Sequence, residues 1–256
     1  MQSPQNPYSD QPGSNPSVVP GALPARGPEI SFDSIGQAWK LLQPNLGTWI
    51  GAFVVYVVIT GIFNMMQGAI SPKDANGAPQ IGPLYFLFSL IGFVVGQFLL
   101  GGLMRMAIAT VRTGRAEFGQ MFSAGDVIPN LIGAGILTTI ATVIGFFLCV
   151  VPGLLLSGLF MFVTPLIVDK RMGAIEAITG SLNALKPQMW MALLFVIVLG
   201  LVAGAGVLAC GVGVLVTAPL ALIALAITYN NFFGGGGQTS IQPPMPPSAP
   251  IANPFN

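Results

Sequence analysis

The chain has 256 residues, a net charge of +1 and a mean hydropathy of +0.78. Only 7% of its residues are charged, whereas about 25% are charged in an ordinary soluble domain. Because a soluble protein of this length needs more charge to cover its surface, the composition predicts an integral membrane protein. The absence of histidine and the presence of only two cysteines exclude His-based triads, His metal sites and zinc frameworks.

Both ends of the chain differ in composition from the rest. Residues 1–30 are rich in Pro, Ser, Asn and Gln, and residues 234–256 are rich in Gly and Pro. Such segments cannot bury enough apolar surface to offset the entropy of ordering, so we expect two disordered tails. Residues 1–30 also lack the apolar core of a secretory signal, so the first hydrophobic span must direct targeting. Residues 31–233 form the predicted membrane domain.

Charged residues are absent from four windows, 41–72, 75–104, 127–168 and 187–256. A helix needs about 20 apolar residues to cross about 30 Å of hydrocarbon, so the first two windows hold one span each and the last two hold two each. Proline and glycine mark the reversals, at Val151-Pro152 and at Cys210-Gly211. The predicted spans are 45–70, 82–104, 127–150, 153–168, 188–209 and 212–233. One long kinked element is the alternative for the third and fourth, but together they exceed twice the bilayer thickness.

The lysines and arginines are divided unevenly between the two sides of this topology. Eight of the nine lie on the side of both termini, and only Lys73 lies on the other. Because positive charge is retained in cytoplasmic loops, we predict two cytoplasmic termini in a bacterial inner membrane. Trp49, Trp190 and Tyr85 fall near predicted span ends, where aromatic residues are expected at the membrane interface.

A weak threefold repeat precedes the odd-numbered spans. Each copy has a short amphipathic stretch followed by a proline, which is Pro44, Pro129 or Pro187, and the strings PNLGTWIG and PNLIGAGI are similar. The apolar positions follow the helical period: Ile35, Ala38, Trp39 and Leu42; Phe118, Met121 and Phe122; Ile175, Ile178, Leu182 and Leu185. The predicted unit is an interfacial helix followed by a transmembrane hairpin. The alternative is that any hairpin-built membrane protein would show this pattern.

The predicted spans contain small and neutral polar residues but no Asp, Glu, Lys or Arg. The glycine pairs 47/51, 92/96 and 200/204 predict close helix contacts, and Pro165 and Pro219 predict kinks. Broken helices form substrate sites in transporters, although such sites usually add ionisable groups. A polar cavity beside the two kinks would favour transport, and a dry, glycine-packed bundle would favour a scaffold. The candidate polar residues are Asn64, Gln67, Gln97, Thr138, Thr139, Ser157, Thr164 and Thr217.

The stretch 165–186 has the densest polar pattern. Its run P-x3-D-x3-G-x2-E-A-x3-S consists of Pro165, Asp169, Gly173, Glu176, Ala177 and Ser181. We interpret the run as structural or as facing lipid headgroups, because Glu176 suits a helix N-terminus and Lys170 and Arg171 suit an anionic surface. A catalytic pair of Asp169 and Glu176 is the alternative, but no activated nucleophile accompanies it.

Together with the strings GGLMRMAIATVRTGRAEFGQMF and IGFFLCVVPGLLL, this run resembles segments of one bacterial membrane family. Its members include the membrane domain associated with glycerophosphoryl diester phosphodiesterases and many uncharacterised six-span proteins. The resemblance covers roughly residues 31–233 and implies a six-helix membrane domain with cytoplasmic termini. It does not imply phosphodiesterase activity, which belongs to a separate soluble domain with His and metal-binding acids.

The sequence therefore predicts an all-α, polytopic transmembrane helical bundle of about six spans with short amphipathic interfacial helices. We expect no enzyme, no cofactor and no nucleic-acid partner; the expected partners are membrane lipids, and a homo-oligomer is left open. The expected role is a membrane-embedded scaffold or lipid-associated module, and the alternative is a transporter of a small neutral solute or lipid. Cys149 and Cys210 fall at equivalent outer turns and could form a disulfide; the alternative is two buried apolar cysteines.

Overall fold

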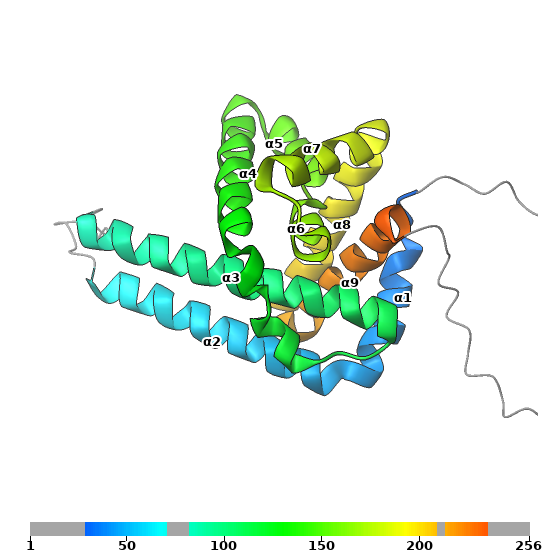
Figure 1. The fold of residues 1–256 in the computed structure, drawn as a ribbon, viewed down its shortest axis with the longest axis horizontal. Coiled ribbons are helices and arrows are strands. Elements are labelled where there is room, and N and C mark those ends of the chain that lie inside the picture. Colours follow the sequence, from blue (N-terminus) through cyan, green and yellow to red (C-terminus); the bar gives the residue numbers. More distant parts are fainter. Residues whose placement is uncertain (1–28, 71–81, 209–212, 235–256) are drawn as a thin grey trace, which may run out of the picture.

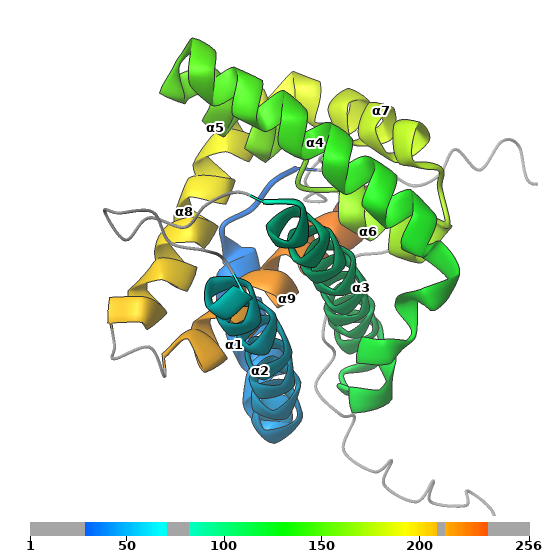
Figure 2. The ribbon, with the colours of Figure 1, turned by 90° about the vertical axis from the view of Figure 1, so that its left-hand side faces the viewer.

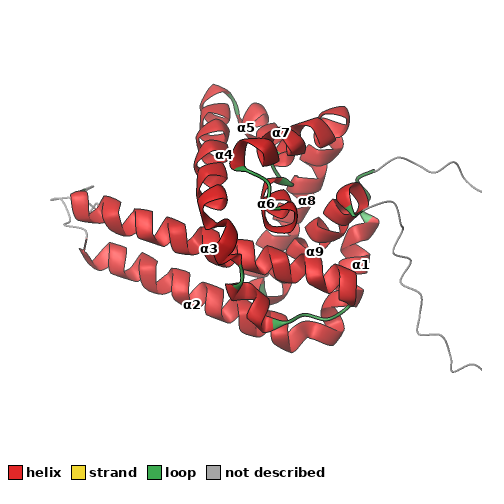
Figure 3. Ribbon diagram, viewed as in Figure 1, coloured by secondary structure: helices red, strands yellow, loops and turns green. Residues whose placement is uncertain are grey.

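The computed structural model describes residues 29–70, 82–208 and 213–234, and every regular element in these ranges is helical (Figure 3). Six helical segments are long and apolar enough to cross a membrane: Asp33–Ala69, Pro83–Thr113, Phe118–Leu148, Val150–Lys170, Ala174–Gly206 and Val214–Phe233. The all-α class and the six-span prediction are therefore confirmed. Most of both predicted tails, and Cys210 with its turn, lie outside the described residues.

Short 3-10 helices, labelled η, connect several of the α-helices. In chain order the elements are α1 (Asp33–Leu42), η1 (Gln43–Asn45), α2 (Leu46–Ile70), α3 (Pro83–Thr113), η2 (Phe118–Phe122), η3 (Ala124–Val127), α4 (Ile128–Leu148), α5 (Val150–Leu159), α6 (Val163–Lys170), α7 (Ala174–Leu185), η4 (Lys186–Gln188), α8 (Met189–Leu208) and α9 (Val214–Phe233).

The spans pair as three hairpins, which are α2 with α3, α4 with α5 and α6, and α8 with α9. In Figure 1 the α2–α3 pair extends to the left beyond the rest of the molecule, while α4, α5 and α7 lie above it. Figure 2 looks along that arm and shows α4 crossing above it and α8 on one side. Large apolar side chains cover the outside of α2, of the first half of α3 and of α4, which suits contact with lipid.

Contacts between the hairpins close them into a ring. Span two (α3) contacts span three (α4), span four (α5) contacts span five (α8), and span six (α9) contacts span one (α2). The segment before each odd-numbered span follows the same rule, because η2 packs on α3, α7 packs on α6, and α1 packs on α9. Each repeat therefore places its leading segment on the last span of the repeat before it.

The first and third repeats match residue by residue. The buried positions of α1 are Ser34, Ala38 and Leu42, and those of α7 are Ala177, Ser181 and Leu185. The proline follows two residues later in both copies, within η1 and η4. The predicted apolar faces are partly wrong, since Trp39 and Ile175 are exposed while small residues make the contact. In the second repeat the expected amphipathic helix is instead the pair of 3-10 helices η2 and η3.

Gly102 explains the second repeat's geometry. A Cβ at this position would lie 1.7 Å from the carbonyl oxygen of Met121, so only glycine lets η2 lie directly on α3. Its neighbour Gly101 faces Leu131 of α4, whose Cδ1 would be 2.6 Å from an added Cβ. The two glycines of the GGLMR string thus seat η2, η3 and α4 against the second half of α3.

Several sequence interpretations of packing were wrong. An added Cβ at Gly47, Gly51, Gly96, Gly200 or Gly204 would meet nothing within 4 Å, and at Gly92 it would meet only Phe63, at 3.7 Å. The close contact between α5 and α8 is made by Gly158, against the backbone of Ala192. Trp49 lies fully buried in the core, whereas Trp190 is exposed. Residue spacing fixes which side of a helix a residue occupies but not which neighbour covers that side.

The fourth span differs from the predicted single helix over 153–168. The chain reverses at Cys149, whose backbone is extended, so Pro152 lies in the first turn of α5 where a proline is tolerated. The span then breaks at residues 160–162, and α6 begins at Val163. Pro165 therefore follows a break, whereas Pro219 lies inside the continuous helix α9.

Candidate functional site

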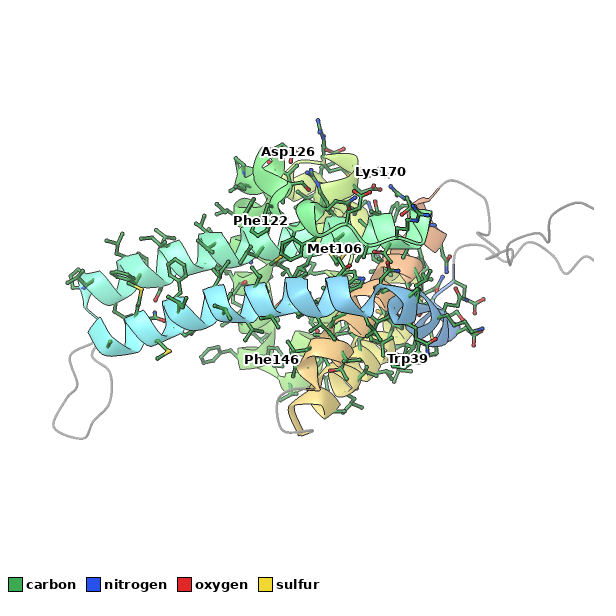
Figure 4. The ribbon with its side chains drawn as sticks, turned by 90° about the horizontal axis from the view of Figure 1, so that it is seen from below. Trp39, Met106, Phe122, Asp126, Phe146 and Lys170 are labelled. Atoms are coloured by element: carbon green, nitrogen blue, oxygen red, sulfur yellow. The ribbon has the colours of Figure 1, made fainter. Side chains whose placement is uncertain are left out.

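Charged residues gather where α3, α6 and α9 end and where η3 precedes α4. Helix α3 has 31 residues, a length of about 46 Å at 1.5 Å per residue, against about 30 Å of hydrocarbon. Arg105 and Arg112 lie in its last turns, about 33 Å and about 44 Å from its start. In Figure 4, Asp126 and Lys170 lie along one edge of the molecule and Phe146 lies on the other side.

Arg105 fastens two segments to α3. Its Nε donates to the carbonyl oxygen of Val168 at 3.2 Å, and its Nη1 donates to the carbonyl oxygen of Ser123. Its Nη2 forms an ion pair with Asp126 at 2.8 Å, and Arg171 contacts the same carboxylate at 3.2 Å. The end of α6 and the start of the third span therefore share one anchor.

A second network joins α3, α6 and α9. Both terminal nitrogens of Arg112 donate hydrogen bonds to the carboxylate of Asp169, at 2.6 and 2.8 Å. The hydroxyl of buried Tyr229 donates to the same carboxylate at 2.8 Å. The Nε of Arg112 reaches Asn230 at 3.4 Å, and Lys170 donates to the carbonyl oxygen of Phe233 at 3.2 Å. A bidentate arginine pair fixes both distance and orientation, so this network sets how the three helices end together.

A cavity of about 330 Å³ separates the two arginines. Helix α3 supplies one wall, and η2 with the following Ser123 and the end of α6 supply the others. The lining residues are Arg105, Ile108, Ala109, Arg112, Thr113, Gln120, Ser123, Val168 and Asp169. The cavity thus combines two guanidinium groups with one carboxylate, two hydroxyls and an amide.

The motif residues of the stretch 165–186 hold the fourth span and α7 together. Asp169 belongs to the arginine network, while the Glu176 carboxylate accepts the Gly173 N–H at 3.4 Å and closes the first turn of α7. Ser181 bridges the helix break, because its hydroxyl donates to the carbonyl oxygen of Leu159 at 2.6 Å and accepts the N–H of Phe162 at 3.3 Å. Pro165 and Ala177 are buried beside this bridge.

These contacts bring the motif to one end of α6 and one face of α7, and give each polar member a structural partner. Asp169 and Glu176 hold different partners, as described above, and no contact joins them. Sequence reasoning missed Arg105, Arg112 and Tyr229 as the partners that organise this end. The available signal was the position of Arg105, which is the first charge after the long uncharged window 75–104.

A second cavity, of about 200 Å³, lies beside the break in span four. Helix α3 supplies Gln97 and Leu100, and α4 supplies Leu131, Ala134, Gly135, Thr138 and Thr139. Phe160, Val163, Thr164 and Ile167 complete the lining. Four residues of the predicted polar set therefore meet here. Asn64 does not, because its amide donates to the carbonyl oxygen of Thr60 in its own helix at 2.7 Å, and Pro219 does not line the cavity.

Metal and cysteine chemistry are limited within the described part of the chain. No three His, Cys, Asp or Glu side chains gather there closely enough to hold a metal ion. Cys149 is exposed at the end of α4. Since Cys210 lies outside the described residues, the disulfide between them stays a prediction.

Comparison with known proteins gives distant relatives. The chain is 22% identical over 260 residues to the uncharacterized protein Rv2560 of Mycobacterium tuberculosis and, equally, to the uncharacterized protein Mb2590 of Mycobacterium bovis. The alignments cover 91% of this chain and 78% of each relative. No family model matches the chain, and no solved structure is significantly similar to it. These relatives establish no link to glycerophosphoryl diester phosphodiesterases. The six apolar helices indicate a multi-pass membrane protein.

Proposed function

We propose that this protein is a non-catalytic, lipid-associated module of a bacterial inner membrane, with both termini in the cytoplasm. The observation that carries the proposal is the cavity of about 330 Å³ between Arg105 and Arg112. We place this cavity at the headgroups of the inner leaflet and assign it an anionic phospholipid headgroup. The resemblance noted in the sequence supports a membrane domain of this kind without phosphodiesterase chemistry.

Depth and charge both support this placement. The cavity begins about 33 Å along α3, which is just beyond the thickness of the hydrocarbon. Eight of the nine lysines and arginines lie on this side of the six-span topology, and each basic residue near an anionic leaflet contributes about 1 kcal/mol. The cavity therefore lies where lipid phosphates are concentrated.

The donor set also suits a phosphodiester. Each guanidinium carries five N–H donors in a planar fork that matches phosphate oxygens. Asp169 occupies one edge of the Arg112 fork, which leaves the outer hydrogens of its terminal nitrogens for a ligand. The hydroxyl groups of Thr113 and Ser123 line the same space. Asp126 and Asp169 pair with Arg105, Arg171 and Arg112, and Lys170 lies beside them. Because cations outnumber carboxylates around the cavity, it favours a headgroup with net negative charge.

Native mass spectrometry of the full chain, released from mixed phosphatidylglycerol and phosphatidylethanolamine vesicles, tests this proposal. We expect retained lipid to be enriched in phosphatidylglycerol. Replacing both partners, Arg112→Gln with Asp169→Asn, should abolish the enrichment, whereas Asp169→Asn alone frees the arginine and should preserve or increase it. The matched control is Arg115→Gln, which removes an exposed positive charge outside the cavity.

The design separates lipid binding from structural support. If Arg112 served only to hold the helices, Asp169→Asn and the double variant would change lipid retention alike. Equal retention of the two lipids by the wild-type chain would refute the proposal. The same spectra report whether the protein is a monomer or a homo-oligomer.

Transport of a small neutral solute or a lipid is the second candidate function. It is favoured by the polar cavity of about 200 Å³ beside a broken span, since discontinuous helices line substrate sites in transporters. Proteoliposomes loaded with radiolabelled glycerol provide the test. Release faster than from protein-free vesicles would support transport, and equal release would exclude it for this solute.

A further inference from the structure

We propose that the cavity between α3, α4 and the break in span four is a binding site for a small, uncharged molecule that carries hydroxyl or amide groups. The two cavities share no lining residue. This site is therefore independent of the headgroup site proposed above, and either can fail without the other.

The cavity lies beside the middle of two apolar spans. Gln97 is about 21 Å from the start of α3, and Thr138 is about 15 Å from the start of α4, close to the middle of each helix. Thr164 projects into the space from the first turn of α6, directly after the break at residues 160–162. Three different spans thus deliver polar side chains to one cavity.

Three of the four polar side chains that line this cavity lack a protein partner among the described residues. The carboxamide of Gln97 and the hydroxyls of Thr139 and Thr164 make no hydrogen bond there, although Gln97 has two N–H donors and a carbonyl acceptor. Thr138 donates to the carbonyl oxygen of Ala134 at 2.7 Å, which leaves its oxygen available as an acceptor. A polar group left unpaired in hydrocarbon is costly, so the cavity calls for a polar occupant.

Gly135 of α4 makes room for the side chain of Gln97. A Cβ at Gly135 would lie 3.0 Å from Cδ and 3.1 Å from Nε2 of Gln97. The lack of a side chain at Gly135 therefore leaves room for the Gln97 carboxamide against α4.

The lining also sets the charge and size of the occupant. No Asp, Glu, Lys or Arg lines the cavity, so an ion would lose its hydration without gaining a counter-charge. The volume of about 200 Å³ corresponds to the space of about six or seven waters. A molecule the size of acetamide or glycerol fits, with room for bridging water.

Saturation-transfer NMR on the full chain in lipid nanodiscs tests the proposal with a matched pair of probes. Acetamide is neutral and acetate is its anionic counterpart of the same shape; glycerol adds a neutral hydroxyl probe. We expect transfer to acetamide and glycerol at least fivefold above transfer to acetate. Empty nanodiscs supply the background.

Two variants and one control locate the site. Gln97→Leu removes the amide and Thr164→Val replaces a hydroxyl with a methyl of similar size; each should reduce transfer at least threefold. The control is Asn64→Leu, which changes an amide in α2 that is bonded to its own helix and should leave transfer unchanged. If Gln97→Leu fails to fold, Thr164→Val alone decides. Wild-type transfer no greater for acetamide than for acetate, or unaffected by Thr164→Val, would overturn the proposal.

Discussion

Replacing Gly102 with alanine should destabilise this protein, although alanine is the better helix former. The added Cβ would lie 1.7 Å from the carbonyl oxygen of Met121 and 2.4 Å from its carbonyl carbon. Ordinary van der Waals contacts of a Cβ atom are longer than about 3.4 Å. Because the backbone of the helix fixes the direction of the new methyl group, α3 and η2 would have to separate. Arg105, one turn further along α3, would then lose its alignment with Ser123 and Asp126.

The expected magnitude follows from two opposing effects. Overpacking a well-packed contact costs about 1–3 kcal/mol and occasionally more, and here the clash is with backbone, which cannot adopt another rotamer. Alanine recovers about 1 kcal/mol of helix propensity relative to glycine. Because the clash is with backbone, we take the overpacking cost at the upper end of this range, about 3 kcal/mol. After the gain in helix propensity, we expect Gly102→Ala to lower the free energy of unfolding by about 2 kcal/mol.

The control is Gly96→Ala in the same helix, where an added Cβ meets nothing within 4 Å. This variant gains helix propensity without a clash and should be neutral or stabilised by up to about 1 kcal/mol. Thermal unfolding in detergent measures both, and a difference of about 3 kcal/mol corresponds to roughly 6–12 °C for a chain of this size. A Gly102→Ala protein as stable as Gly96→Ala would refute the described contact between η2 and α3.

Three further predictions concern the helix break, the arginine network and the topology. Ser181→Ala leaves the Leu159 carbonyl and the Phe162 N–H without their partner. Chemical denaturation should show a free energy of unfolding lower by about 2–4 kcal/mol. The control Thr179→Ala removes an exposed hydroxyl from the same helix and should change the free energy of unfolding by less than about 0.5 kcal/mol. Asp169→Asn removes a charge held by Arg112 and Tyr229 and should lower the free energy of unfolding by about 1–3 kcal/mol, and no change in the unfolding transition would contradict the network. An alkaline phosphatase reporter should be active when inserted within 71–80 and inactive after residue 256, and an active reporter at the C-terminus would refute the six-span orientation.

The short helices show how far the repeat could be predicted. The three prolines before the odd-numbered spans marked the three junctions, and α1 and α7 are separate helices as expected. The predicted apolar faces included Ala38, Leu42 and Leu185 but not the small residues Ser34, Ala177 and Ser181, which make the other buried contacts. An amphipathic pattern reports where apolar side chains recur, whereas close packing between two backbones selects small side chains whatever their polarity.

The candidate sites were predicted unevenly for a related reason. The motif of Pro165, Asp169, Gly173, Glu176, Ala177 and Ser181 is visible in the sequence as a run of fixed spacing. Its contacts to Arg112 and Tyr229 are not visible there, because those residues are distant in sequence. Gln97, Thr138, Thr139 and Thr164 were identified as polar residues within spans, and only the packing of three spans brings them to one cavity. Asn64 was expected there too, but its own helix satisfies it.

The sequence by itself determined that this chain enters a membrane, how many apolar helices it has and roughly where they reverse. Those properties are local, because hydrocarbon excludes charge and requires each crossing segment to satisfy its own backbone. The tertiary structure decided that the three hairpins close into a ring, that span four is broken, and that two separate cavities form along α3. Such features depend on which helix faces meet, and in lipid that choice rests on steric fit and a few polar contacts rather than on hydrophobicity.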